Sequence, residues 1–214
     1  MAVIKKFSIP APAGVLEGVW HLPDVCPEPG RRETPRAIAV VAHPLPTMGG
    51  TMDNKVVTTL AKAFAEMGFV TLRFNFRGVG ASTGVFDSGN GEVEDVLAMV
   101  RYAQQEQGDL PLVLAGFSFG GFVQARVAKH LHPQPHQLVL IAPAAGRYDV
   151  PPVPHNTLVV HGEQDEVIPL TDLMDWARPQ HLPIVVLPEA GHFFHGRLSQ
   201  LKQVVLHHFC GRQP

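Results

Sequence analysis

The sequence is poor in cysteine, in clustered positive charge and in long apolar runs. Its only two cysteines, Cys26 and Cys210, form no Cys-x-x-Cys pattern, so free thiols are expected rather than a disulfide framework. The 17 Lys and Arg residues form no block and face 19 Asp and Glu residues, which disfavours binding to nucleic acid or to an anionic membrane. No stretch reaches the ~18 apolar residues of a membrane span, and the first ten residues lack the apolar core of a signal peptide. We therefore expect a cytoplasmic protein.

The length and the punctuation of the chain predict one domain over residues 1–214. A chain of 214 residues can build a core that needs no disulfide or metal to hold it. The 20 proline and 20 glycine residues form no repeat and separate many short elements. This pattern favours an α/β fold over a helix bundle.

Short apolar runs predict the strands. Two extended runs at residues 3–9 and 14–22 predict an antiparallel entry hairpin, and a proline-rich loop at 23–35 follows it. Further runs are continuously apolar and rich in β-branched residues, as expected of strands buried on both faces of a parallel sheet. These runs cover residues 37–42, 69–74, 112–115, 137–141, 157–160 and 183–187.

Helical periodicity appears between these runs. Apolar residues at spacings of three and four predict helices over 56–67 and around 93–100, a third directly after Ser118 and a last one over about 196–209. Right-handed crossovers then give a mainly parallel central sheet with helices on both faces. In such sheets ligands bind at the carboxyl ends of the strands, so the residues that follow each run are the candidates for function.

The strongest chemical signal is Gly116-Phe-Ser-Phe-Gly120, which follows a predicted strand and opens a predicted helix. Gly-x-Ser-x-Gly in this context is a nucleophile elbow, with Ser118 exposed on a sharp, strained turn. Side chains at the flanking glycine positions would collide with neighbouring backbone. We therefore predict that Ser118 is a nucleophile.

A serine nucleophile requires a base and a carboxylate that orients the base. The strand ending at residue 160 is followed by a loop with three carboxylates, Glu163, Asp165 and Glu166. The last strand is followed by His192, our candidate base, and by His195, which we expect further along the next helix or on the surface. Ser, acid and His thus follow one another in the order that the elbow requires.

The oxyanion of such a reaction needs two N–H donors. One is expected from the Phe119 backbone, and the other from the loop that begins His43-Pro44-Leu45-Pro46. Because proline has no N–H, Leu45 is the free donor of this stretch. For His43 a buried, hydrogen-bonded ring that braces the loop is favoured over a catalytic role.

Five motifs together resemble the small bacterial α/β-hydrolases, specifically a compact family of serine hydrolases with little or no lid. They are His43-Pro-x-Pro-x-x-Gly-Gly-Thr-Met-Asp-Asn-Lys, Arg73-Phe-Asn-Phe-Arg-Gly-Val-Gly, Gly116-Phe-Ser-Phe-Gly-Gly, Gly162-Glu-Gln-Asp-Glu-Val and Gly191-His192. The resemblance implies an α/β-hydrolase fold without a cap domain and esterase-type chemistry. The family pattern has a second histidine where this chain has Leu45, so a substrate contact from that position is not carried over.

The resemblance also assigns the site. It implies Ser118 as nucleophile, Asp165 as acid and His192 as base, with the oxyanion hole at Leu45 and Phe119. It implies that Asn75 and Arg77 pin neighbouring loops as scaffold.

The predicted function is hydrolysis of small carboxylic esters, or thioesters, without a cofactor or metal. The connection between residues 142 and 157 is too short for a helical cap, and apolar residues flank the predicted site, of which Met48, Phe117 and Phe193 are our candidate substrate contacts. The expected partner is a small ester, with a monomer or homodimer as the working unit. Two alternatives stay open, a small peptidase or amidase and an idle binding protein on a hydrolase scaffold.

Overall fold

The computed structural model describes residues 3–23 and 35–210. Its strands are β1 (Val3–Ala11), β2 (Gly14–Leu22), β3 (Ile38–Ala42), β4 (Val70–Phe74), β5 (Leu112–Phe117), β6 (Gln137–Ile141), β7 (Leu158–Gly162) and β8 (Val185–Leu187). Its helices are α1 (Lys55–Glu66), α2 (Asn90–Gln107), α3 (Phe119–His130), α4 (Leu170–Ala177) and α5 (Leu198–Phe209), with the 3-10 turns η1 (Pro46–Met48) and η2 (Arg178–Gln180).

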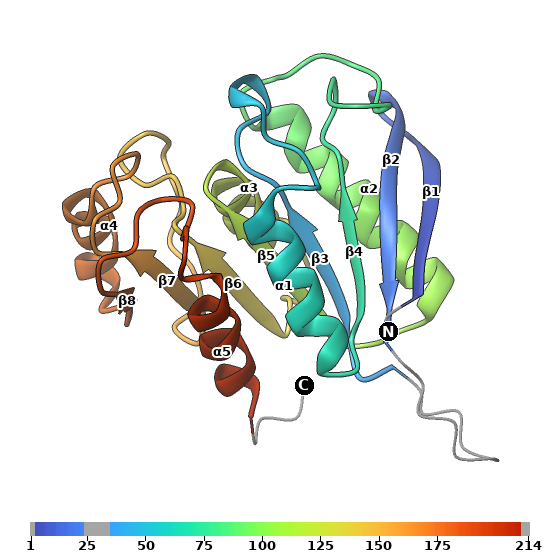
Figure 1. Cartoon of the computed structure of the whole chain (residues 1–214). Coiled ribbons are helices and arrows are strands. Elements are labelled where there is room, and N and C mark those ends of the chain that lie inside the picture. Colours follow the sequence, from blue (N-terminus) through green and yellow to red (C-terminus); the bar gives the residue numbers. More distant parts are fainter. Residues whose placement is uncertain (1–2, 24–34, 211–214) are drawn as a thin grey trace.

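The strands form one twisted sheet in the order β1-β2-β4-β3-β5-β6-β7-β8 (Figure 1). β1 pairs with β2 and β2 with β4 in antiparallel fashion, whereas every pairing from β4 to β8 is parallel. The predicted entry hairpin and the mainly parallel sheet are therefore confirmed. The segments that follow β3, β5, β7 and β8 consequently leave from the same edge of the sheet.

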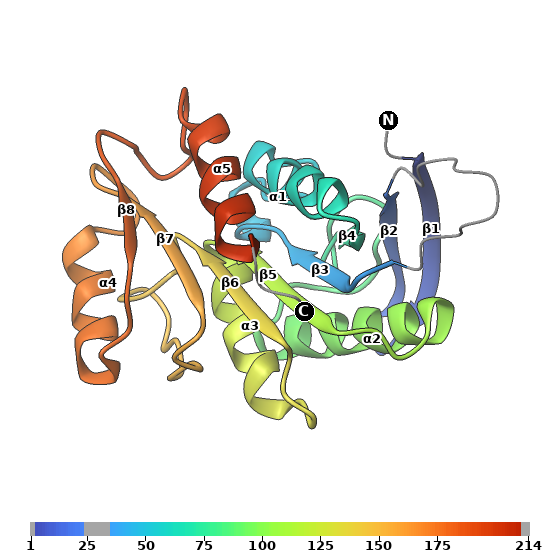
Figure 2. The same cartoon turned by 90° about the horizontal axis from the view of Figure 1, so that it is seen from below.

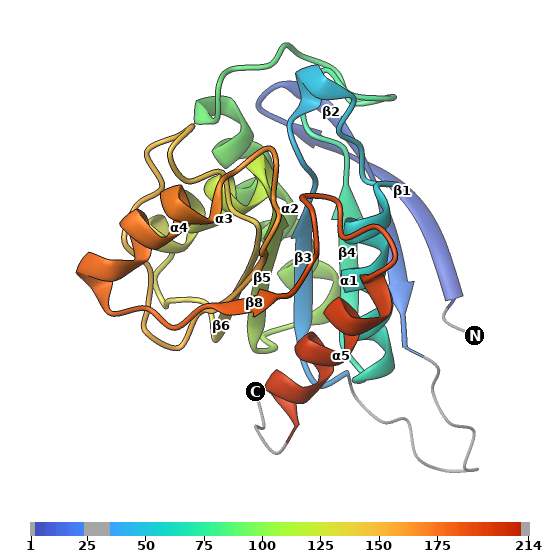
Figure 3. The ribbon, with the colours of Figure 1, turned by 60° about the vertical axis from the view of Figure 1, so that its left-hand side comes forward.

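Helices cover both faces of this sheet (Figure 2). α1 and α5 lie side by side on one face, as Figure 3 also shows, and α2, α3 and α4 pack on the other. The side chains of β3 alternate between the two layers: Val40 belongs to the core under α2 and α3, and Val41 to the core under α1. Burial on both faces is why these strands are continuously apolar.

Among the details that differ from the sequence-based expectations, three have a clear physical reason. β5 continues to Phe117, two residues beyond the predicted run, because its last residues still pair with β6. Helix α4 was not predicted, since it has eight residues and buries only Leu173 and Ala177. α5 begins at Leu198, because Phe194 and Gly196 have φ angles of 53° and 70° that a right-handed helix cannot accept.

Other expectations are met where the structure describes the chain. The connection between β6 and β7 contains no helix, as expected for a chain without a cap there. Cys210 is a free, exposed thiol, whereas Cys26 and most of the loop at 23–35 lie outside the described residues. Among the helices of residues 3–23 and 35–210, none has the length and apolar character that crossing a membrane requires.

Candidate active site

Ser118 occupies the turn between a strand and a helix. β5 ends at Phe117 and α3 begins at Phe119, so Ser118 alone joins them. Its backbone lies at φ 54° and ψ −118°, a region that residues with a side chain rarely adopt. The Ser118 N–H donates to Ile141 O of β6 at 2.9 Å, which fixes the turn to the adjacent strand. The predicted strand–turn–helix geometry is confirmed.

The glycines of the motif are required by contact with backbone. A Cβ on Gly116 would lie 2.3 Å from Gly120 O, and a Cβ on Gly120 would lie 2.5 Å from Ala42 O. Neither approach is tolerable for a real side chain, and neither neighbour is a flexible side-chain end. The predicted collision of flanking side chains is confirmed, and the turn is seated directly against the end of β3.

Asp165 is the buried carboxylate of the loop after β7. Its Oδ1 accepts hydrogen bonds from the N–H groups of Val167 at 2.9 Å and Ile168 at 2.7 Å. Its Oδ2 lies 2.8 Å from Nδ1 of His192. Burial by itself would raise the pKa of Asp165, but the hydrogen bond from His192 and the bond from Ile168 outweigh it and hold this pKa below its ordinary value. The side chain is thus an ionised, fixed partner for His192.

The other two carboxylates of this loop are exposed and bond to backbone. Glu163 Oε2 accepts from the N–H of Glu189 at 2.9 Å. Glu166 Oε2 accepts from the N–H of His192 at 3.2 Å. Both tie the loop after β7 to the loop after β8. Neither carboxylate is described in contact with an imidazole, which distinguishes them from Asp165.

His192 lies next to the strand end that carries the serine. The imidazole is buried and packs on the ring of Phe117, with ring centroids 4.9 Å apart, so it stands beside the residue that precedes Ser118. Among the described residues, no group hydrogen-bonds to His192 Nε2 or to Ser118 Oγ. His195 is exposed and lies before α5 rather than in it, so the expected surface position is confirmed and the expected helical offset is wrong.

Two backbone N–H groups near this edge of the sheet have no hydrogen-bond partner among the described residues. Phe119 is the first residue of α3, where no preceding turn of helix can accept its N–H. Leu45 precedes η1, and its carbonyl accepts from Met48 and Gly50 at 3.1 and 3.0 Å. In residues 3–23 and 35–210 the N–H of Leu45 donates to no backbone or side-chain acceptor. Both groups have the chemistry of oxyanion-hole donors.

Comparison with known proteins places the chain among the α/β serine hydrolases. Residues 33–156 match the model of the family described as serine aminopeptidase, S33. The chain belongs to this family. An uncharacterized protein of Rickettsia prowazekii is 31% identical over 182 residues, which cover 78% of this chain and 76% of that protein.

Solved structures agree with this assignment. An α/β serine hydrolase without a lid from Xanthomonas campestris is 38% identical with a TM-score of 0.89, over 99% of this chain and 95% of that one. An α/β serine hydrolase homologue from Coxiella burnetii is 39% identical with a TM-score of 0.81, over 95% and 96% of the two chains. The predicted α/β-hydrolase fold without a lid is confirmed, and the chain is a serine hydrolase of this superfamily.

In this hydrolase the histidine of the β3 loop is structural, as the sequence analysis favoured. His43 is fully buried, with Nδ1 2.6 Å from Pro44 O and Nε2 accepting from the N–H of Phe76 at 3.0 Å. Burial lowers the pKa of His43 to about 4, although the bond to Pro44 acts in the opposite direction. The neutral ring therefore bonds two backbone segments and has no nitrogen left for catalysis.

The predicted scaffold residues hold the same region. Asn75 Oδ1 accepts from the N–H of Met52 at 2.8 Å, and its Nδ2 donates to Glu17 at 2.7 Å. Arg77 donates to the buried carboxylate of Asp95 through Nε at 3.1 Å and Nη2 at 2.9 Å. Both side chains pin neighbouring segments, as predicted.

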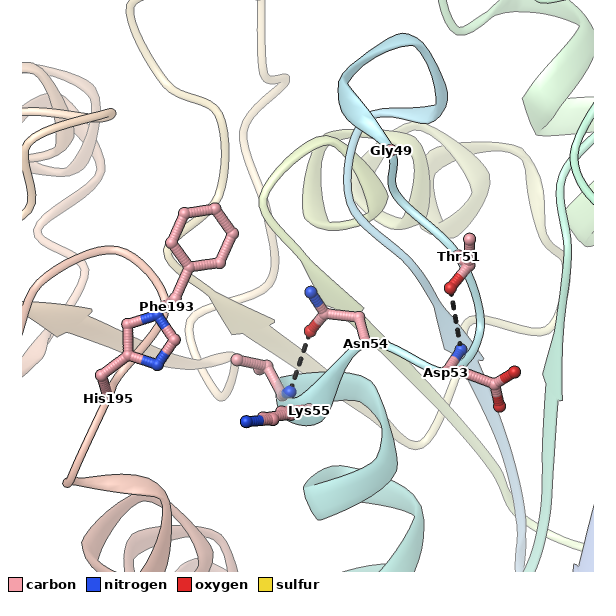
Figure 4. A pocket seen from close by; sticks show the side chains of 8 residues that line it. Gly49, Thr51, Asp53, Asn54, Lys55, Phe193 and His195 are labelled. Carbon is pink, nitrogen blue, oxygen red and sulfur yellow. Dashed lines mark hydrogen bonds between the residues drawn. The ribbon is translucent and has the colours of Figure 1, made fainter.

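A pocket of about 270 Å³ opens next to Phe193, the residue that follows His192 (Figure 4). Phe193 and His195 line one side of it, and Asn54, which precedes α1, and Lys55, the first residue of α1, lie on the other. Of the predicted substrate contacts, Phe193 is 39% exposed and Met48 82% exposed, whereas Phe117 is fully buried. Phe117 therefore packs against the His192 ring and offers no exposed surface to this pocket.

A further histidine near the acid was not singled out from the sequence. His161 of β7 is fully buried, with Nε2 2.9 Å from Ile168 O and 3.5 Å from Asp165 Oδ2. The only sequence signal is its position, because a histidine directly after a run of buried apolar strand residues must point into the core or into a site.

Proposed function

We propose that this serine hydrolase is an esterase that cleaves small carboxylic esters, or thioesters, through an acyl-enzyme on Ser118. The observation that carries the proposal is the buried Asp165–His192 pair, with 2.8 Å between Oδ2 and Nδ1, next to the strained turn at Ser118. A buried carboxylate that holds one nitrogen of an imidazole directs the other nitrogen to act as a base.

In the acylation step Ser118 Oγ attacks the carbonyl carbon of the ester. His192 Nε2 takes the hydroxyl proton, and the negative Asp165 stabilises the imidazolium that results. The oxyanion accepts hydrogen bonds from the N–H groups of Leu45 and Phe119, each worth about 2.7–4 kcal/mol in comparable sites. The imidazolium then protonates the leaving alcohol or thiol as its bond to the carbonyl carbon breaks.

Water completes the cycle. His192 Nε2 removes a proton from a water molecule, which attacks the acyl carbonyl, and the proton then returns to Ser118 Oγ as the acyl bond breaks. The carboxylic acid product leaves and the starting state is restored. The cycle therefore consumes one water molecule for each ester that is cleaved.

The proposed acyl or alcohol site is the pocket next to Phe193. Its volume of about 270 Å³ suits a small group, and the exposed face of Phe193 offers an apolar contact within it. We therefore place small uncharged esters ahead of long or charged ones.

Amide or peptide hydrolysis is the second candidate, because the family is described as serine aminopeptidase. The same residues would act, with the imidazolium protonating a leaving amine. The connection between β6 and β7, which has no helix, offers no cap that would select a peptide terminus.

Steady-state hydrolysis separates the candidates. The wild-type protein, Ser118→Ala and the control Ser199→Ala, which changes an exposed serine of α5, are assayed with p-nitrophenyl acetate, p-nitrophenyl octanoate and an aminoacyl p-nitroanilide. We expect turnover of the acetate that is lost in Ser118→Ala and kept in Ser199→Ala. Preferential turnover of the anilide would identify a peptidase, and equal rates for wild type and Ser118→Ala would indicate an idle scaffold.

A further inference from the structure

Two histidines approach the same carboxylate oxygen. Asp165 Oδ2 lies 2.8 Å from His192 Nδ1 and 3.5 Å from His161 Nε2. Of these two histidines, the catalytic cycle proposed above uses only His192. His161 is nevertheless fully buried next to the Asp165 carboxylate. A buried imidazole at such a place calls for a physical reason.

The first reason is that His161 and Asp165 both form hydrogen bonds with the backbone of Ile168. His161 Nε2 is 2.9 Å from the Ile168 carbonyl, and the Ile168 N–H donates to Asp165 Oδ1 at 2.7 Å. The imidazole thus holds Ile168 by its carbonyl, and the carboxylate holds the same residue by its N–H. His161 and Asp165 are therefore connected by two hydrogen bonds through one residue, and His161 helps to fix the position of a donor to Asp165.

The second reason lies in the protonation state of His161. Since Nε2 faces a carbonyl oxygen, it carries the proton, and the buried Nδ1 has no hydrogen-bond partner among the described residues. A second proton on Nδ1 would create a buried N–H without an acceptor. Burial accordingly lowers the pKa of His161, although the bond to Ile168 and the charge of Asp165 oppose this, and His192 adds to it. His161 therefore stays neutral and leaves the Asp165 charge to His192.

We propose that His161 is a positioning residue that orients Asp165 through Ile168 and, by remaining neutral, reserves the carboxylate charge for His192. The inference rests on the proposed function, because it assigns Asp165 and His192 to the reaction. It predicts that turnover depends on the hydrogen-bond donor at the Nε2 position of residue 161 more than on the presence of an aromatic ring there.

The test compares His161→Phe, which keeps a ring without a donor, with His161→Gln, whose amide nitrogen can reach the position of Nε2. Thr157→Val is the matched control, because Thr157 is also buried with an unpaired polar atom but precedes the other end of β7. The readouts are kcat and KM for p-nitrophenyl acetate, the thermal midpoint, and the downfield NMR signal of the His192 Nδ1 proton.

We expect His161→Phe to lower kcat at least tenfold with KM unchanged within about twofold, and to weaken or remove the His192 proton signal. His161→Gln should keep kcat within about threefold of wild type and retain the signal, and Thr157→Val should match wild type in both. If His161→Phe does not fold, His161→Asn replaces it, because its amide is too short to reach the Nε2 position.

Two results would overturn the proposal. One is a donor-free variant with wild-type kcat and an intact His192 signal. The other is an equal loss of kcat in the Gln variant and in the donor-free variant, in step with their thermal midpoints, which would make His161 a packing residue only. If the wild-type protein hydrolyses no ester, the proposed function fails separately, and the NMR signal still decides whether His161 positions Asp165.

Discussion

The loops after β3 and after β8 leave the same edge of the sheet, and each contains a buried histidine. In the β3 loop both nitrogens of His43 are bonded to backbone, to Pro44 O and to the N–H of Phe76. In the β8 loop the His192 imidazole is bonded, as far as the structure describes the chain, through Nδ1 alone, and its partner is the ionised Asp165. Both imidazoles are therefore buried. They differ in the charge of the hydrogen-bond partner and in whether the second ring nitrogen is bonded.

The difference separates a stability role from a proposed catalytic one. A neutral ring bonded on both sides joins segments of the fold, and protonating it breaks a hydrogen bond. A ring that a carboxylate holds through one nitrogen keeps its other nitrogen free to accept a proton, which is what a general base needs. Changes near His192 should therefore affect turnover first, and changes near His43 should affect the free energy of unfolding first.

The largest expected effect is that of Asp165→Asn on turnover. The amide can no longer stabilise the imidazolium or select its tautomer, and kcat for p-nitrophenyl acetate should fall by roughly 10⁴. Glu163→Gln is the matched control from the same loop, since Glu163 bonds only backbone in the described structure, and it should stay within about threefold of wild type. A large loss in the control and none in Asp165→Asn would assign the acid to Glu163.

The pH dependence of stability tests His43. Unfolded His43 takes up a proton below about pH 6.5, whereas the folded ring stays neutral until about pH 4. The stability that this ring contributes is therefore complete above pH 6.5 and is lost as the pH falls toward 4, by about 3 kcal/mol. Urea unfolding at pH 7 and pH 4 should show this additional loss in wild type relative to His43→Gln. Parallel losses in the two proteins would refute the structural role.

The turn that carries Ser118 packs directly against the end of β3, and this contact links the nucleophile to the loop that contains His43. Gly120→Ala places a Cβ 2.5 Å from Ala42 O and should reduce the free energy of unfolding by about 2 kcal/mol. In Gly121→Ala the nearest atom is 3.2 Å away, on Pro143, so the cost should be under about 1 kcal/mol. Chemical denaturation of both variants measures the difference, and an equal cost would mean that α3 can shift away from β3.

The smallest effect concerns substrate selection. Phe193→Ala removes part of the apolar wall of the pocket and should lower kcat/KM for the octanoate ester about fivefold, or about 1 kcal/mol, with the acetate ester within twofold. Met48→Ala should have less effect, because this side chain is 82% exposed. A uniform loss on both esters in Phe193→Ala would show that the ring supports His192 instead of the substrate.

Most of the fold could be predicted from the sequence because buried parallel strands have a strong local signal. The run at 37–42 and the motif around Ser118 are continuous in the chain, and each predicts its own element. Helix α4 escaped prediction because eight residues with two buried positions show little periodicity. The start of α5 was misplaced because the backbone of Phe194, with φ 53°, is set by its surroundings.

The features of the site that depend on the burial of a side chain could not be predicted from the sequence. Three carboxylates share one loop, and only the folded structure shows that Asp165 is buried while Glu163 and Glu166 are exposed. The burial of Phe117 and the place of His161 behind the acid follow from strand pairing and from the loop at Ile168. Such contacts join residues that are distant in the chain and leave no local pattern.

The most direct test of the central claim is intact-mass spectrometry after treatment with a fluorophosphonate, followed by mapping of the modified residue. The account predicts one adduct per chain on Ser118 in the wild-type protein and none in Ser118→Ala. A folded wild-type protein that takes up no reagent, or an adduct on another residue, would contradict it.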